Sequence, residues 1–172
     1  MAPNEAHPFD RRSFFTSNER KDLGYGVELW RGIFQSVRPA IERLIVTVDL
    51  STGVVFKAGP LIRLCLDLIA IPGLSPNQLY PTTMGFQERD RVRLQSKLKY
   101  LKVTCRTTGP QPRTIRSISK EGANTLRINP EDENSDTIVQ YFQSLNMAVR
   151  YPNCICVKEC FHKQTSYFGV SY

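Results

Sequence analysis

Residues 29–50 read LWRGIFQSVRPAIERLIVTVDL, and this stretch decides the fold class of the chain. Its second half alternates between apolar and polar side chains, as a half-buried strand does. The apolar set falls on one face and the polar set on the other: Leu44, Val46, Val48 and Leu50 against Arg43, Thr47 and Asp49. The pattern predicts strands over residues 27–37 and 41–50, on either side of Arg38-Pro39. A turn at residues 51–53 and a short strand over 54–57 follow.

Two helices and further short strands are predicted beyond this stretch. Pro60 opens a helix whose apolar residues recur at i, i+3, i+4, i+7 and i+8 from Leu61. A short basic helix is predicted over residues 87–97, and Gly109-Pro110 with Pro112 indicates a turn. Strands are predicted over residues 101–106, 113–118, 154–158 and 165–170. Short strands with one or two inserted helices predict a small, partly open β-barrel.

A further helix and a lead-in complete the prediction. Ser135 or Asp136 is expected to cap a helix with one apolar face, formed by Ile138, Tyr141, Phe142 and Leu145. Residues 1–22 are polar and show little periodicity, which predicts a flexible lead-in.

Composition indicates a globular, basic protein. The 172 residues are 41% hydrophobic and 23% charged. The sequence contains no run of about 18 apolar residues, the length that a membrane-spanning helix needs. Five cysteines without a secretory signal favour free thiols in a reducing, cytoplasmic setting. The net charge is +7, and residues 89–120 hold ten Lys and Arg against one acid, Asp90. Such a segment suits a polyanion such as a nucleic acid, although a solvated helix face would look the same.

Signatures of catalysis are missing from the sequence. There are two histidines, His7 and His162, and no Gly-rich phosphate loop, nucleophile elbow or paired-carboxylate motif. The one group to weigh for zinc is Cys154-x-Cys156-x3-Cys160-x-His162. In a straight strand these ligands would spread over more than ~20 Å, too far for one ion, so the zinc alternative requires a hairpin turn. We therefore expect buried thiols, no metal, no cofactor and no enzymatic activity.

Two motifs resemble the Argonaute family. LWRGIFQSVRPA at residues 29–40 is similar to the segment that opens the first linker domain, and VDLSTG at residues 48–53 is similar to the stretch that follows it. Downstream, Leu101-Lys102-Val103, Val139-Gln140-Tyr141-Phe142 and Tyr151-Pro152 resemble the PAZ domain of the same family. The resemblance covers about residues 24–172 and suggests the linker-1 and PAZ portion of a fungal-type Argonaute.

The resemblance implies a fold, a division of the chain into domains, and a function. The fold would be mixed β with α: an OB-like β-barrel with an inserted hairpin-helix module, preceded by a small α+β linker domain. The division would be a lead-in at 1–22, a linker-1-like domain at 23–60 and a PAZ-like domain at 61–172. The implied function is to anchor the 3′ end, with its two-nucleotide overhang, of small guide RNAs in RNA silencing. The implied partners are single-stranded or 3′-overhang duplex RNA and other silencing proteins, without a membrane.

The resemblance also implies a binding pocket. Arg113 matches a phosphate-binding arginine, and Tyr141 matches the helix tyrosine whose hydroxyl contacts the terminal phosphodiester. Tyr167 matches a late tyrosine of the closing strand, and Lys163 corresponds to a nearby basic residue. At four further pocket positions this chain departs from the family's polar or aromatic residue, with Thr107, Ile115, Leu126 and Leu145.

Three alternatives stay open at the level of the sequence. Tyr141 could instead pack in the core, and Arg113 could be a solvated turn residue. The whole chain could instead be a truncated Argonaute-like module for protein interaction or dominant-negative action, with a degenerate RNA pocket.

Overall fold

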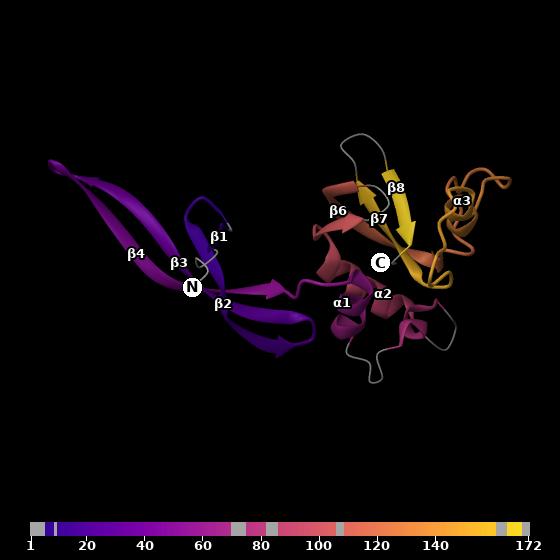
Figure 1. Ribbon diagram of the computed structural model, residues 1–172, viewed down its shortest axis with the longest axis horizontal. Helices are drawn as coiled ribbons and strands as arrows, with labels where there is room; N and C mark the ends of the chain where they lie inside the picture. The colour runs from indigo at the N-terminus through magenta and orange to yellow at the C-terminus, as the bar shows by residue number, and fades with distance from the viewer. Residues whose placement is uncertain are drawn as a thin grey trace. The chain divides into compact units, whose positions relative to one another are not determined.

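The structure is a computed structural model that describes residues 6–8, 10–69, 75–81, 86–105, 109–160 and 165–169. The side chains of residues 6, 19, 105, 109, 110, 159, 160 and 165–169 are not described. The chain forms two compact units, Met1–Ala58 and Gly59–Tyr172 (Figure 1). Each unit has its own four-stranded sheet. The architecture is therefore mixed and rich in sheet with few helices, as the sequence predicted.

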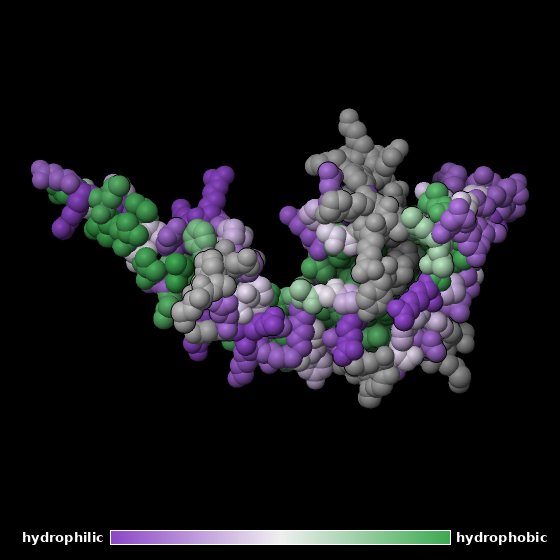
Figure 2. All heavy atoms as spheres, viewed as in Figure 1, coloured by the Kyte–Doolittle hydropathy of each residue, from purple (hydrophilic) through white to green (hydrophobic). Residues whose placement is uncertain are grey.

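The first unit is an antiparallel sheet in the order β1-β2-β3-β4. Its strands are β1 (Ala6–Pro8), β2 (Ser13–Gly24), β3 (Val27–Ala40) and β4 (Arg43–Phe56). The β3–β4 pairing runs without a shift from Val27↔Phe56 to Ala40↔Arg43. Glu42 takes a positive φ of 64° in the turn between them. The long hairpin exposes many apolar side chains, and Figure 2 shows hydrophobic residues gathered along it.

This sheet corrects three predictions. The segment expected to be a loose lead-in holds β1 and most of β2, which is ordered by pairing with β3 rather than by a local pattern. Residues 23–60, described throughout, contain strands and no helix, so the predicted α+β linker is wrong. The turn expected at residues 51–53 is also wrong, because β4 continues through Gly53.

A packing contact explains the glycine that suggested that turn. A Cβ atom on Gly53 would lie 2.9 Å from Cε1 of Phe15, and one on Gly32 would lie 2.5 Å from its Cδ1. The Phe15 ring, 8% exposed, thus covers two glycines on neighbouring strands. Both glycines make room for a side chain and do not end a strand.

The second unit combines helices with an antiparallel sheet in the order β5-β6-β7-β8. The pairings among its described strands leave β5 and β8 at the two edges and do not close a barrel. In chain order the elements are α1 (Leu61–Ile69), η1 (Pro76–Leu79), α2 (Glu88–Leu98), β5 (Lys102–Cys105), β6 (Gly109–Gly122), α3 (Ile138–Ser144), β7 (Ile155–Cys160) and β8 (Thr165–Gly169).

The helices and strands of this unit largely follow the predicted pattern. The apolar stripes of α1 and α2 are buried, through Leu64 and Leu68 on one helix and Leu94 and Leu98 on the other. The turn predicted at residues 109–112 is wrong, because β6 begins at Gly109 and includes both prolines. No helix in the described part of the chain is long and apolar enough to cross a membrane.

Side chains of α2 fasten it to β6. Strand β5 pairs with β6 as far as Lys102↔Thr114, so its ladder does not reach Ile118. There Gln95 Oε1 accepts a hydrogen bond from the Ile118 N–H (3.1 Å), and Arg91 Nη1 donates to the Ile118 carbonyl (3.0 Å). These two side chains satisfy backbone groups that a neighbouring strand would otherwise satisfy.

Candidate nucleic-acid interface

Helix α3 carries the predicted site residue Tyr141, is followed by a second one, Leu145, at its C-cap, and begins with a capping box. The Thr137 hydroxyl accepts from the Gln140 N–H (3.3 Å), and Gln140 Oε1 accepts from the Thr137 N–H (2.8 Å). The cap is therefore Thr137, not Ser135 or Asp136 as predicted. Both of those residues precede Thr137, which bridges to Arg127, and the helix begins at Ile138.

The predicted apolar face of α3 divides into a buried and an exposed part. Ile138 and Phe142 are buried in a cluster with Ala123 and Cys156, against which Leu126 packs. Tyr141 and Leu145, by contrast, are 43% and 48% exposed. A helix of seven residues buries only a narrow stripe at i, i+4, so the neighbouring stripe faces outward.

The Tyr141 ring lies at the surface, supported from one side. Its centroid is 5.6 Å from that of Phe142, in an edge-to-face arrangement. The core-packing alternative for this side chain does not fit its exposure, because a core aromatic would be covered on all sides. The ring can present its hydroxyl to a ligand in solution.

Strand β6 carries two more predicted residues, and both point into the unit. Arg113 is 6% exposed and lies opposite Val103 of β5, so it is not the solvated turn residue of the alternative interpretation. Ile115 is fully buried, and its backbone bonds to Tyr100 and Leu101. Its side chain therefore belongs to the core of the unit.

The remaining predicted residues lie elsewhere. Leu126 is half-buried beside α3. The backbone of Tyr167 pairs with Lys158 in the β7–β8 ladder, and α3 packs close to β8. Thr107 and Lys163 lie outside the described residues. The structure thus brings α3, which carries Tyr141, close to β8, which contains Tyr167.

The basic segment 89–120 is only partly available for a ligand. Arg91 bonds to Glu88 and to Ile118, and Lys97 Nζ lies 3.4 Å from the Leu68 carbonyl near the end of α1. The hydrogen bond to Glu88 is the main reason that the pKa of Arg91 is raised. Exposed cations remain on α2 and its C-cap, on β5 and on β6, namely Arg89, Arg93, Lys99, Lys102, Arg116 and Lys120.

Three of the five cysteines, Cys65, Cys154 and Cys156, have described side chains, and all three are buried free thiols. Burial raises the pKa of Cys65 and of Cys156 to about 12 and that of Cys154 to about 11. No group of three metal-ligating side chains occurs among the described residues. The predicted zinc alternative extends to His162, outside that part of the chain.

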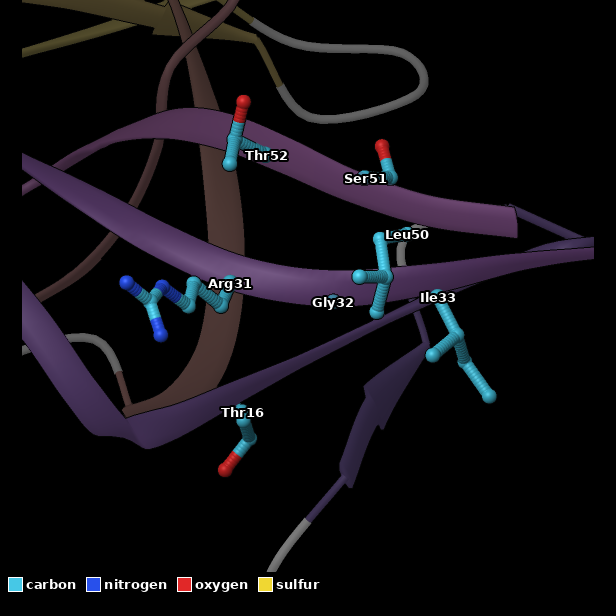
Figure 3. A pocket seen from close by; sticks show the side chains of 7 residues that line it. All are labelled: Thr16, Arg31, Gly32, Ile33, Leu50, Ser51 and Thr52. Atoms are coloured by element: carbon cyan, nitrogen blue, oxygen red, sulfur yellow. The ribbon is translucent and has the colours of Figure 1, made fainter.

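Sequence reasoning missed a hollow in the sheet of the first unit. A concavity of about 460 Å³ is lined by Thr16, Arg31, Gly32, Ile33, Leu50, Ser51 and Thr52 (Figure 3). A second one, of about 270 Å³, is lined by Arg20, Lys21, Leu29 and Arg31. Because Arg31 lines both, the two hollows adjoin. The available signal was Arg31 itself, a cation inside an apolar strand.

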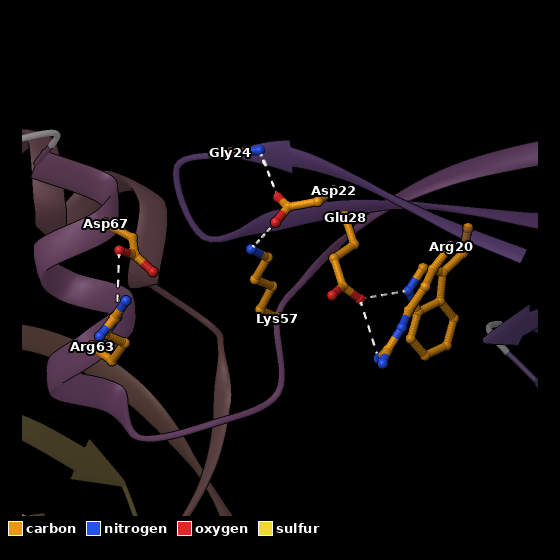
Figure 4. A network of polar contacts seen from close by, with 8 residues as sticks. Arg20, Asp22, Gly24, Glu28, Lys57, Arg63 and Asp67 are labelled. Atoms are coloured by element: carbon orange, nitrogen blue, oxygen red, sulfur yellow. Dashed lines mark hydrogen bonds and ion pairs between the residues drawn. The ribbon is translucent and has the colours of Figure 1, made fainter. Parts of the chain in front are cut away.

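Polar contacts also join charged side chains within the first unit (Figure 4). Lys57 Nζ pairs with Asp22, and this hydrogen bond, with a second from the Gly24 N–H, lowers the pKa of Asp22. Glu28 Oε2 accepts from Trp30 Nε1 (3.1 Å) and lies 3.9 Å from Arg20 Nη1.

Comparisons with known proteins agree with the resemblance seen in the sequence. A sequence model of the Argonaute linker 1 domain matches residues 11–57. The structure of Kluyveromyces polysporus Argonaute with a guide RNA is similar over 96% of this chain, at 13% identity and a TM-score of 0.58. This chain spans 20% of that protein.

Two Drosophila structures are similar at lower scores. The Argonaute2 PAZ domain matches 53% of this chain and 80% of its own, at 18% identity and a TM-score of 0.39. Piwi matches 92% of this chain and 19% of its own, at 12% identity and a TM-score of 0.34. The linker 1 match and the fold shared with the Kluyveromyces protein confirm the predicted resemblance of this chain to the Argonaute family.

Proposed function

We propose that the chain is an RNA-binding module that anchors the 3′ ends of small guide RNAs in RNA silencing, in the cytoplasm and without cleavage activity of its own. The observation that carries the proposal is the exposed Tyr141 hydroxyl-bearing ring on α3, close to β8. A half-exposed tyrosine beside an apolar side chain suits an RNA end, which offers phosphates to the hydroxyl and an unstacked base to the apolar surface.

The proposed pocket uses the region between α3 and the sheet of the second unit. Tyr141, Tyr167, Lys163 and Arg113 would contact the terminal phosphates, and Leu126 and Leu145 would face the last base. In this proposal residues 61–172 are a PAZ-like domain with an OB-like barrel, and residues 23–60 belong to a linker-1-like domain. The Kluyveromyces protein, which shares the fold, was solved with a guide RNA, and this supports the proposal.

The test is a binding titration with a duplex carrying a two-nucleotide 3′ overhang and with a blunt duplex of the same sequence. We expect the overhang to bind more tightly. Tyr141→Phe should weaken overhang binding by about tenfold or more, because a hydrogen bond to a charged group is worth about 1.5–3 kcal/mol. The matched control is Tyr100→Phe, which removes one hydroxyl from a tyrosine 67% exposed in the same unit. Equal binding of both duplexes would refute the proposal.

A second function is supported by the apolar surface around α3. Leu145, Met147 and Ile128 are exposed, and a hollow of about 390 Å³ adjoins the helix beside Val139 and Gln143. Exposed apolar side chains of this kind suit a protein partner. A protein-interaction module with a degenerate RNA pocket would bind neither duplex preferentially, and Tyr141→Phe would then leave RNA binding unchanged.

A further inference from the structure

Strand β4 forms an open edge of the first unit's sheet. It is the last strand in the order β1-β2-β3-β4, so its outer side has no partner among the described strands. Its inner side pairs with β3 in a ladder without a bulge, and beyond the Ser13↔Phe34 pair this hairpin extends without β2 (Figure 1). Arg43–Phe56 contains no Pro and no Lys, which are residues that protect edge strands from pairing. A long and unprotected edge of this kind can accept a further strand.

The hydrogen bonds of the hairpin identify the backbone groups at that edge. The Lys57 N–H, just beyond β4, donates to the Gly26 carbonyl (2.9 Å), so these two opposed residues form a hydrogen-bonded pair. Such pairs alternate with non-bonded pairs along an antiparallel ladder that has no shift. The odd-numbered residues of β4 therefore bond to β3, and the even-numbered residues direct their N–H and C=O groups outward. Leu44, Val46 and Val48 are of this kind and are 70%, 61% and 57% exposed.

Strand β4 has two charged residues, and their charges are opposite. Arg43 and Asp49 are odd-numbered, so both lie on the sheet face that does not carry Leu44, Val46 and Val48. Both charged residues are exposed, and neither forms an ion pair with another described residue. Six residues of strand separate them by about 20 Å, so they cannot pair with each other. Each charge is thus available to a second strand at this edge.

The strand that complements this edge is β4 of a second copy, running antiparallel. When Val46 lies opposite Val46 of the second copy, Arg43 of each copy lies opposite Asp49 of the other. Directly opposed residues have Cβ atoms about 4.5–5.5 Å apart, which allows an ion pair at both ends. The same register places Leu44 opposite Val48 and joins the outward N–H and C=O groups of the two strands. A shift of the register in either direction separates the opposite charges.

We propose that two copies of this chain form a dimer by pairing residues 43–49 at the outer edges of their β4 strands. An isologous contact uses the same edge of both copies, so the assembly closes at two. A contact made by one short strand segment is smaller than the ~1,200 Å² at which standard interfaces begin, so the dimer is a weak one. The proposal does not involve RNA and is independent of the function proposed for the second unit.

The test is sedimentation equilibrium of the full chain, freed of RNA, between about 5 and 200 μM, the range for a weak dimer. We expect the mass to rise with concentration from 19.7 kDa toward twice that value. Val46→Pro removes an outward N–H at the centre of the contact and no bond to β3, so it should raise the dissociation constant at least tenfold. The matched control is Val54→Pro, at another even-numbered valine of β4, 64% exposed and outside residues 43–49. It should stay within about twofold of the wild type.

Two charge reversals test the register. Arg43→Asp places an aspartate opposite Asp49 of the second copy, and Asp49→Arg places an arginine opposite Arg43. Each variant by itself should dimerise about tenfold more weakly than the wild type, because like charges face each other at both ends. An equal mixture of the two variants should recover the affinity of the wild type, because opposite charges then face each other at both ends. A folding defect in either variant could not produce this recovery.

Four results would overturn the proposal. A mass of one chain at every concentration would mean that a second copy does not occupy the edge, which would leave it to a different protein. Masses above two chains would mean open-ended association. Equal weakening by Val46→Pro and Val54→Pro would place the contact outside residues 43–49. Failure of the mixed charge variants to associate would refute the register, and this result decides the question even if Val46→Pro lowers the melting temperature.

Discussion

The contact between α2 and β6 predicts the effect of one substitution in detail. Gln95 Oε1 accepts two hydrogen bonds, from the Ile118 N–H (3.1 Å) and from Arg91 Nη1 (3.2 Å). Gln95→Ala removes both and leaves a part-buried backbone N–H without this acceptor. Such an unsatisfied group costs about 1–3 kcal/mol, so we expect a loss of about 2 kcal/mol in the free energy of unfolding. In a chain of this size that loss lowers the melting temperature by about 4–8 °C.

Two further variants make the prediction specific, measured by thermal and urea unfolding. Gln95→Glu keeps an oxygen acceptor for both donors and should recover most of the stability. Ser96→Ala is the control on the next residue, because its hydroxyl bonds to the Arg93 carbonyl within the same helix (2.8 Å). It should change stability by less than about 0.5 kcal/mol. The reasoning would be refuted if Gln95→Ala and Ser96→Ala had equal melting temperatures, or if Gln95→Glu recovered none of the lost stability.

Two other predictions follow from the second unit. Thr137→Ala breaks the capping box with Gln140 and should cost about 1 kcal/mol in urea unfolding, while Thr137→Ser should be nearly neutral; equal losses in both would argue against the cap. The thiols of Cys65, Cys154 and Cys156 have folded pKa values raised from 9.0 to about 12, 11 and 12. Their contribution to the free energy of unfolding is therefore fully present below pH 9 and is lost as the pH rises from 9 through these folded pKa values. Urea unfolding should therefore show stability falling above pH 9, and thiol reagents at pH 8 should modify these cysteines only after unfolding.

The local elements of the second unit could be predicted from the sequence because their signals are local. The stripes of α1 and α2 follow from apolar spacing alone, and burial of Leu64 and Leu94 agrees with it. β2 could not be predicted in this way. Its residues 17–22 read SNERKD, with no alternation, and the strand exists because β3 supplies a long partner. The turn predicted at Gly53 was wrong for a similar reason. The glycine is required by the ring of Phe15, which is far away in the sequence.

The candidate site was predictable in its residues more than in their surroundings. The helical spacing put Tyr141 and Leu145 on the same face as Ile138 and Phe142. It could not predict which of these four side chains are buried and which are exposed. That boundary depends on which side chains pack from elsewhere, here Ala123 and Cys156.

The alternation in β4 shows the same limit. The period of two correctly grouped Leu44, Val46, Val48 and Leu50 on one face, as the register confirms. It also predicted that this face would be half-buried, whereas all four side chains are exposed, Leu50 by 94%. A two-residue period states which side chains share a face, but what covers that face depends on the rest of the fold. The same period carries Arg31 onto the face of Leu50, opposite Thr52, and puts Asp49 on the other side. The alternation alone therefore could not predict that a strand face with these apolar side chains would stay exposed.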